Sequence, residues 1–245
     1  MGFFSTLTES ALDALFPRRC PLCGTVIAPN QRICGKCSDN VIYINPPVCR
    51  LCGRNTFDCV CDDRPRHYER CVSPFVYTKA ARNGIHRLKF QRGASSAPYF
   101  GSFMAQTVSR EYRDEKIDLI VSVPMHREDI SRRGYNQSAL LADSVGKALD
   151  IPVRNNVLLK RRHNNAQHSL SRAERRQNVQ DAFEVSRSYL VSGRTILICD
   201  DVITTGSTLD ECARILLAAG ARKVLCVTAA AVVGAYQSNA KRAYV

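Results

Sequence analysis

The fold of this 245-residue chain is decided by one stretch, Thr195-Ile-Leu-Ile-Cys-Asp-Asp-Val-Ile-Thr-Thr-Gly-Ser-Thr208. It starts with a short apolar run, continues with two acids, and ends in a turn rich in glycine and hydroxyl groups. A short apolar run bounded by turn residues predicts a buried strand, and the turn leads into a predicted helix. In a parallel sheet such a turn lies at the carboxyl end of the strand, where ligands bind. The stretch therefore predicts an α/β fold with a ligand site beyond residue 199.

Strands and helices alternate on both sides of this stretch. Apolar runs predict strands at 72–77, 119–124, 157–159, 195–199 and 223–231. Helical spacing predicts helices at 80–90, 95–112, 137–149, 171–178 and 208–219, and Ser171 with Glu174 forms a capping box. This alternation predicts a parallel sheet with helices on both faces.

The turn at 204–208 has the chemistry of a phosphate cradle. Its glycine lets the backbone approach an anion, and the hydroxyls and the first N–H groups of the next helix donate to it. The two acids before the turn would repel a phosphate unless they face ribose hydroxyls or Mg²⁺, so we expect both at an open strand end. The predicted site consists of Asp200, Asp201, Thr204, Thr205, Gly206, Ser207 and Thr208.

Eight of the twelve cysteines lie close together near the start of the chain. They form four pairs, Cys20 with Cys23, Cys34 with Cys37, Cys49 with Cys52, and Cys59 with Cys61. A Cys-x-x-Cys-Gly turn directs two sulfurs at one point, and two such turns supply the four thiolates that suit zinc. Without a secretory signal, this pattern indicates metal rather than disulfides.

Two structural zinc ions are therefore predicted, because a segment this short cannot build a core and needs metal to fold. Sequential pairing of the cysteine turns is the simplest assignment, and interleaved pairing stays open. The one-residue spacer between Cys59 and Cys61 makes the second predicted site less regular than the first.

The charge balance and the N-terminus limit the functional class. Lys and Arg number 35 against 22 Asp and Glu, a net charge of +13, which indicates polyanionic partners or serves solubility alone. No apolar run is long enough to cross a bilayer, and acids stand where a signal peptide needs its apolar core. We expect a cytoplasmic protein without membrane insertion, starting with an amphipathic helix at 1–17.

These motifs resemble known families. The stretch at 195–208 is similar to the phosphoribosyl-diphosphate-binding motif of type I phosphoribosyltransferases. Val123-Pro124, Arg-Arg-Gly-Tyr-Asn-Gln at 132–137, and the segment 167–183 resemble the ComF/GntX family. That family joins a cysteine-rich zinc module to a phosphoribosyltransferase-like domain, and its better-known members are linked to DNA uptake in natural competence. The resemblance covers 20–231, and the one-residue spacer of the last cysteine pair departs from it.

The resemblance implies a double zinc ribbon at 18–66 and a type I phosphoribosyltransferase-like domain at 67–245. It implies that the acids hold the ribose hydroxyls and that the loop binds the 5′-phosphate of phosphoribosyl diphosphate, which comes with Mg²⁺. Lys89 would be an exposed helix lysine on sequence grounds alone, although the family also has lysine there. The resemblance adds five residues to the diphosphate site, Lys89, Pro124, Met125, Arg127 and Arg133.

The implied activity is transfer of a phosphoribosyl group to a nitrogen acceptor, a glycosyltransferase reaction of nucleotide metabolism. The alternative is a non-catalytic competence protein that binds nucleic acid or senses a ligand. Whether turnover occurs, and whether single-stranded DNA or proteins of a DNA-uptake machinery are partners, is left open. The basic run at 160–176 has three interpretations: a solvated face, a lid over the diphosphate, or a nucleic-acid patch.

Overall fold

The computed structural model describes residues 17–59, 61, 64–90, 93–161 and 182–233. Several sequence predictions lie outside these residues. They are the N-terminal helix except for its last residue, the capping box and helix at 171–178, and the basic run beyond residue 161.

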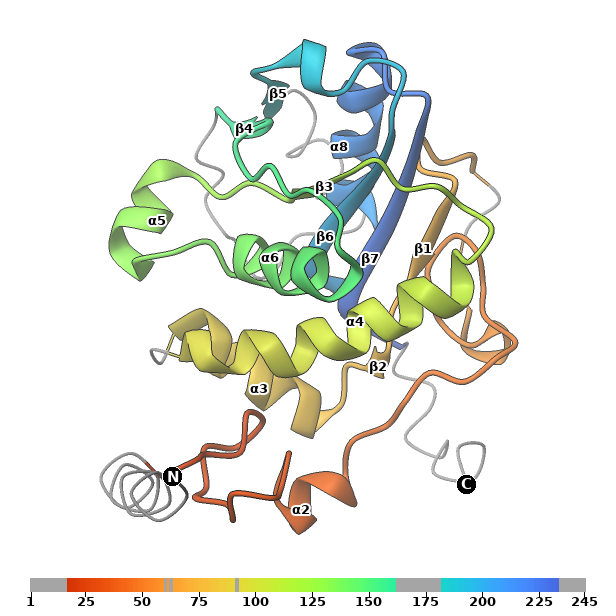
Figure 1. Ribbon diagram of the computed structural model, residues 1–245. Helices are drawn as coiled ribbons and strands as arrows, with labels where there is room; N and C mark the ends of the chain where they lie inside the picture. Colours follow the sequence, from red (N-terminus) through yellow and green to blue (C-terminus); the bar gives the residue numbers. More distant parts are fainter. Residues whose placement is uncertain (1–16, 60, 62–63, 91–92, 162–181, 234–245) are drawn as a thin grey trace, which may run out of the picture.

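A parallel sheet of five strands forms the centre of the molecule (Figure 1). Its order is β1-β7-β6-β3, and β2 also pairs with β7. The strands are β1 (Arg70–Val72), β2 (Phe75–Val76), β3 (Leu119–Ser122), β6 (Thr195–Ile203) and β7 (Lys223–Ala231). The parallel α/β sheet predicted from the sequence is thus confirmed.

Helices cover both faces of this sheet (Figure 1). Three of them, α3 (Lys79–Phe90), α4 (Ala97–Glu111) and α6 (Gln137–Leu149), share one apolar core with Leu197 and Leu225. On the other face, α8 (Ser207–Ala218) shares a second core with Ile196 and Cys226. Successive residues of one strand serve opposite cores because side chains alternate across a sheet.

The remaining elements are short. An antiparallel pair, β4 (Leu158–Lys160) and β5 (Phe183–Val185), packs beside α8. The short helices are α2 (Gly35–Ser38), α5 (Arg127–Arg133), and the 3₁₀ turns η1 (Thr56–Asp58), η2 (Gly93–Ser96) and η3 (Ser188–Leu190).

The strands differ from the sequence prediction at several places. The predicted strand at 157–159 is β4, which pairs antiparallel with β5 outside the central sheet, and the predicted strand at 119–124 ends at Ser122. The predicted strand at 72–77 is divided into β1 and β2 around Ser73-Pro74, since proline has no N–H for the ladder. β6 continues past Cys199 to Ile203, because its backbone pairs with β7 over that length. Asp200 and Asp201 therefore belong to the strand itself, and only the turn at 204–208 follows it.

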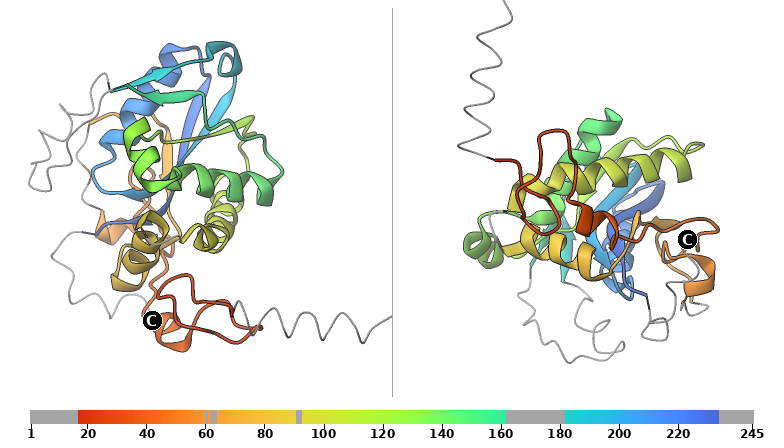
Figure 2. Two further views of the ribbon diagram at one scale, coloured as in Figure 1. Left: turned by 90° about the vertical axis from the view of Figure 1, so that its left-hand side faces the viewer. Right: turned by 90° about the horizontal axis from the view of Figure 1, so that it is seen from below.

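The cysteine-rich segment packs against the α/β sheet and its helices at two places (Figure 2). Leu22 is fully buried in the core beneath α3, where a Cβ on Gly84 would lie 2.8 Å from the Leu22 Cδ2. Further along the chain, Gly53 forms a parallel bridge with Val72, and a Cβ on Gly53 would lie 3.0 Å from the Val72 Cα. The boundaries at 18–66 and 67–245 stay predictions, and the chain on both sides of residue 66 shares one core.

Across the described ranges, no helix combines the length and the apolar character that crossing a membrane requires.

Candidate functional site and metal centres

The eight paired cysteines gather into two clusters, grouped in the sequential order. Within each cluster all Sγ atoms lie within 4.8 Å of one another, and the clusters are Cys20-Cys23-Cys34-Cys37 and Cys49-Cys52-Cys59-Cys61. The Cys23–Cys34 sulfurs are 3.6 Å apart and the Cys52–Cys59 sulfurs 3.8 Å apart. A zinc tetrathiolate with bonds of about 2.3 Å has sulfur–sulfur edges of about 3.8 Å. Both clusters therefore fit closed structural zinc sites, and the interleaved pairing does not occur.

Asp201 is held inside the molecule by two side chains from different helices. It is 5% exposed, and its Oδ2 accepts a hydrogen bond of 2.8 Å from the Gln137 Nε2. The Lys89 Nζ lies 2.8 Å from the same oxygen. Burial alone would lower the pKa of Lys89, but the charge of Asp201 raises it above its ordinary value. The expectation of an open carboxylate is wrong for Asp201, and the exposed-lysine interpretation of Lys89 is wrong too, because the two form an ion pair.

Asp200 lies beside this ion pair and is only half-buried. Its Oδ1 accepts two hydrogen bonds of 2.8 Å, from the Ser138 Oγ and from the backbone N–H of Asp201. Burial, and then the neighbouring charge of Asp201, raise the pKa of Asp200 to about 7. The neutral form of Asp200 is therefore favoured up to a higher pH than that of a free aspartate.

Gln137 and Ser138 contact the acids. Gln137 ends the family motif at 132–137 and Ser138 follows it, but the sequence analysis predicted a contact with the acids for neither. Both stand at the start of α6, which Asn136 caps by accepting a 3.0 Å hydrogen bond from the Ser138 N–H. The Asn136 Nδ2 also donates to the Val123 carbonyl at 2.9 Å, which fixes the start of α6 to the end of β3. The sequence does contain a signal for the start of α6, since an asparagine followed by a helical pattern is typical of an N-cap.

The two arginines at the end of α5, Arg132 and Arg133, have different surroundings. Arg133 donates to the Gln137 Oε1 and lies 4.8 Å above the ring of Phe90, so it adjoins the acidic pair through Gln137. Arg132 pairs with Asp129 at 2.7 Å, and its side chain is 78% exposed. Only Arg133 is therefore placed to affect the site.

The turn at 204–208 joins β6 to the N-terminus of α8, as the sequence predicts. Gly206 has φ of +78°, a left-handed conformation that favours glycine. The Thr205 Oγ1 and Ser207 Oγ are 2.9 Å apart, and Thr208 is half-buried in the first turn of α8. Backbone N–H groups at a helix start and clustered hydroxyls are the groups that bind a phosphate.

The turn after β3 reaches the same edge of the sheet. The Val123 N–H donates to the Cys199 carbonyl at 3.0 Å, so Pro124 follows directly beside Asp200. Met125 and Arg127 continue this turn into α5.

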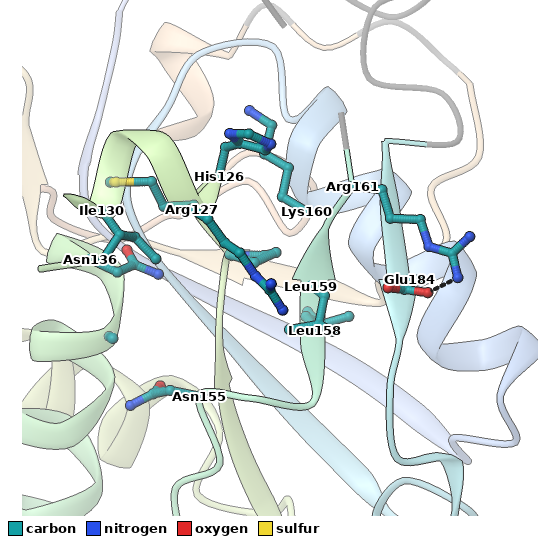
Figure 3. Close-up of a pocket in the computed structure, with 13 residues that line it drawn as sticks. His126, Arg127, Ile130, Asn136, Asn155, Leu158, Leu159, Lys160, Arg161 and Glu184 are labelled. Atoms are coloured by element: carbon teal, nitrogen blue, oxygen red, sulfur yellow. Dashed lines mark ion pairs between the residues drawn. The ribbon is translucent and has the colours of Figure 1, made fainter. Parts of the chain in front are cut away.

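Part of this turn lines a cavity of about 530 Å³ (Figure 3). Its walls are the turn at 124–127 with α5 and the start of α6 on one side, and β4 and β5 on the other. Arg127 extends towards Leu158 and Leu159, and Arg161 forms an ion pair with Glu184 (Figure 3). Among the described residues, none of 200–208 lines this cavity, so it does not include the two acids or the turn at 204–208.

The fold and these sites define a phosphoribosyltransferase-type domain joined to a double zinc ribbon. Residues 11–72 match the double zinc ribbon domain family, and residues 130–244 match the phosphoribosyl transferase domain family. The chain is 31% identical over 208 residues to the DNA utilization protein YhgH of Escherichia coli K12, which covers 84% of this chain and 86% of that protein.

Two further relatives carry competence names. Competence protein F of Haemophilus influenzae is 31% identical over 196 residues, 78% of this chain and 81% of that protein. Competence protein ComFC of Bacillus subtilis is 29% identical over 205 residues, 80% of this chain and 82% of that protein. The chain belongs to the ComF family.

The purified protein should contain two zinc ions per chain, measured by elemental analysis. Cys37→Ser and Cys52→Ser should each lower the content to one, because each removes a thiolate from a different cluster. Cys212→Ala, which changes a buried thiol outside both clusters, should keep two. A wild-type content of one or less would contradict the second site.

Asp200→Asn should stabilise the folded protein at alkaline pH. The pKa of Asp200 is about 7 in the folded state against an ordinary 3.8, so folded Asp200 holds a proton that the unfolded chain has lost. The free energy of unfolding therefore falls as the pH rises from about 4 to 7. Asparagine cannot ionise and keeps an oxygen for both hydrogen bonds.

The melting temperature of Asp200→Asn should exceed that of the wild type by a few degrees at pH 8, and the difference should shrink as the pH is lowered towards 5. Thermal scans across this range measure it. A difference that does not change with pH would show that Asp200 titrates at its ordinary pKa.

Proposed function

We propose that this protein binds phosphoribosyl diphosphate together with Mg²⁺ and transfers the phosphoribosyl group to a nitrogen acceptor. One observation carries the proposal. A carboxylate with a raised pKa, Asp200, stands four residues before a glycine- and hydroxyl-rich turn at the N-terminus of α8. A ribose 5-phosphate needs an acceptor for its hydroxyls and donors for its phosphate, and these residues supply both kinds of group.

In this proposal, different residues of the site would bind different parts of phosphoribosyl diphosphate. Residues 204–208 would receive the 5′-phosphate on backbone N–H groups and hydroxyls. Asp200 would receive the ribose hydroxyls, since within the described chain both of its hydrogen bonds reach Oδ1 and leave Oδ2 to turn to the ligand. Asp201 would support the site without binding the ligand through Oδ2, because Lys89 and Gln137 already contact that oxygen.

The turn at 124–127 would receive the diphosphate. It stands beside Asp200 at the end of β3, and Arg127 supplies a guanidinium that suits bidentate phosphate contact. Mg²⁺, which takes oxygen ligands, would enter bound to the diphosphate and neutralise part of its charge.

The reaction breaks the bond between C1′ and the diphosphate oxygen, and the diphosphate leaves with the electron pair. The acceptor nitrogen forms the new bond to C1′ and releases its proton to solvent. Positive charge develops on the ribose after the C1′–oxygen bond starts to break and before the C1′–nitrogen bond is complete. This charge would lie close to the carboxylate of Asp200. The residues of this chain then contribute position and charge stabilisation rather than a covalent intermediate.

The names of the relatives suggest the setting of this activity. They refer to DNA utilization and to competence, so we place the protein in the cytoplasmic handling of incoming DNA, with proteins of that machinery as partners. The second candidate function is non-catalytic binding of single-stranded DNA, which the net charge of +13 favours.

Asp200→Asn should weaken phosphoribosyl diphosphate binding about tenfold or more, because a hydrogen bond to a charged group contributes about 1.5–3 kcal/mol. Titration calorimetry with Mg²⁺ present measures the affinity. Asp118→Asn is the matched control, since Asp118 precedes β3 at the opposite end of the sheet and should bind like the wild type. Equal affinities for Asp200→Asn and the wild type would contradict the assigned site.

The same preparations decide whether the protein is an enzyme. Diphosphate release in the presence of nucleobases and amines measures turnover. Binding without release from any of these acceptors would favour the ligand-sensing alternative.

The DNA alternative predicts steep salt dependence of single-strand affinity, with a slope of about 0.7 per phosphate contact. Replacing Arg161, Arg162, Arg175 and Arg176 with Gln should flatten that slope if the basic run tracks DNA. If the run is a lid, the same variant should instead lose phosphoribosyl diphosphate binding. Fluorescence anisotropy at several salt concentrations measures the slope, and Arg113→Gln, at an arginine that is 79% exposed, is the control.

A further inference from the structure

A buried arginine connects the second cysteine cluster to the phosphate loop. Arg54 follows the Cys49-Arg-Leu-Cys52-Gly53 turn and is 3% exposed. Its Nη2 donates a 2.6 Å hydrogen bond to the carbonyl of Thr204, the first residue of the loop. Its Nε donates to the Val232 carbonyl at 2.5 Å, just after β7 ends. One side chain thus joins the cysteine-rich segment to the carboxyl ends of two neighbouring strands, β6 and β7.

The charge of Arg54 needs compensation that these carbonyls do not supply. A buried guanidinium is costly unless it is both hydrogen-bonded and paired with a negative charge. The Cys52 sulfur is in contact with Arg54, because it accepts hydrogen bonds from the backbone N–H and the side chain of that residue. The Arg54 carbonyl in turn accepts from the Cys49 N–H at 2.7 Å. Four thiolates around one Zn²⁺ carry a net charge of −2, so the loaded cluster is the counter-ion for Arg54.

A tyrosine makes a second contact between the same two parts. Tyr68 is 2% exposed, and its hydroxyl donates to the Leu51 carbonyl inside the cysteine turn at 2.7 Å. A Cβ on Gly206 would lie 2.8 Å from the Tyr68 Oη, so the loop packs closely on this ring. The turn itself is fixed to β1, because the Cys71 N–H donates to the Arg50 carbonyl at 2.8 Å.

The first cysteine cluster has different surroundings. Cys20 and Leu22 are buried in the core shared by α3 and α4, and the Ser96 Oγ donates to the Pro21 carbonyl at 3.1 Å. The contact of the cysteine-rich segment with the loop is made by Arg54, which lies between Cys52 and Cys59 of the second cluster. The chain therefore holds two chemically equal zinc clusters, of which one adjoins the loop.

We propose that Arg54 is a positioning residue that couples zinc binding at Cys49, Cys52, Cys59 and Cys61 to the conformation of the phosphate loop. With zinc bound, the guanidinium is neutralised and holds the Thr204 carbonyl, which orients the N–H groups of 204–208. Without zinc, the guanidinium loses its counter-ion and the loop loses its anchor. A loop that is ordered in advance binds its ligand more tightly, because less conformational entropy is lost on binding.

The proposed ordering of the loop does not depend on the ligand, whereas the expected change in affinity rests on the proposed function. Hydrogen exchange of peptides spanning 203–208 therefore serves as the first readout. Zinc content and affinity for phosphoribosyl diphosphate are measured on the same full-length proteins.

Arg54→Gln should keep at least the first zinc, speed loop exchange about tenfold, and weaken phosphoribosyl diphosphate binding by a similar factor, since two hydrogen bonds from a charged group are lost. Arg54→Lys keeps the charge and should restore part of the protection. Cys52→Ser should reproduce the loop exchange of Arg54→Gln. Cys37→Ser, which empties only the first cluster, should leave loop exchange at the wild-type rate.

Unchanged loop exchange in folded Arg54→Gln would overturn the proposal, as would equal loop exchange in Cys37→Ser and Cys52→Ser. If Arg54→Gln fails to fold, the comparison of the two cysteine variants decides. If loop exchange responds as expected but the wild type does not bind phosphoribosyl diphosphate, the coupling stands and the proposed function fails.

Discussion

Two carboxylates on consecutive residues of a buried strand repel each other, and much of the site is arranged around that repulsion. Lys89 from α3 neutralises Asp201, and Gln137 donates to the same oxygen. Ser138 donates to Asp200, whose pKa still rises to about 7. The places where α3 and α6 meet the sheet are thus set by the charges as well as by apolar packing. Removing one partner would leave a buried charge unpaired, which is costly.

The features that the sequence predicted depend on neighbours along the chain. Paired cysteines, a strand followed by a glycine turn, and alternating strands and helices are all local patterns, so the α/β fold and both clusters could be derived. The partners of Asp201 could not, because Lys89 lies more than a hundred residues earlier and only the fold brings them together. β6 was predicted too short for a related reason, since pairing with β7 overrides the low strand propensity of aspartate.

Arg54 is the clearest case of a residue that local patterns do not reveal. In the sequence it is one of many basic residues, and it follows a cysteine turn with no motif of its own. Its burial at 3% and its hydrogen bond to the Thr204 carbonyl come from the docking of that turn on β1. A double zinc ribbon joined to an α/β domain could have been a separate module, but here Arg54 of its second half donates a hydrogen bond to the first residue of the loop.

In the proposed function, the electrostatics of the acidic pair would let the site bind a sugar without a large structural change. Burial favours the neutral form of Asp200, whereas ribose hydroxyls donating to it favour the carboxylate. At neutral pH the two forms are close in free energy, so a few hydrogen bonds from the ligand are enough to select the charged one. Arg54 and Tyr68 already hold the loop from the side of the cysteine-rich segment. In the proposed function, the ligand would therefore meet a loop that is fixed in advance and a carboxylate whose charge the ligand itself determines.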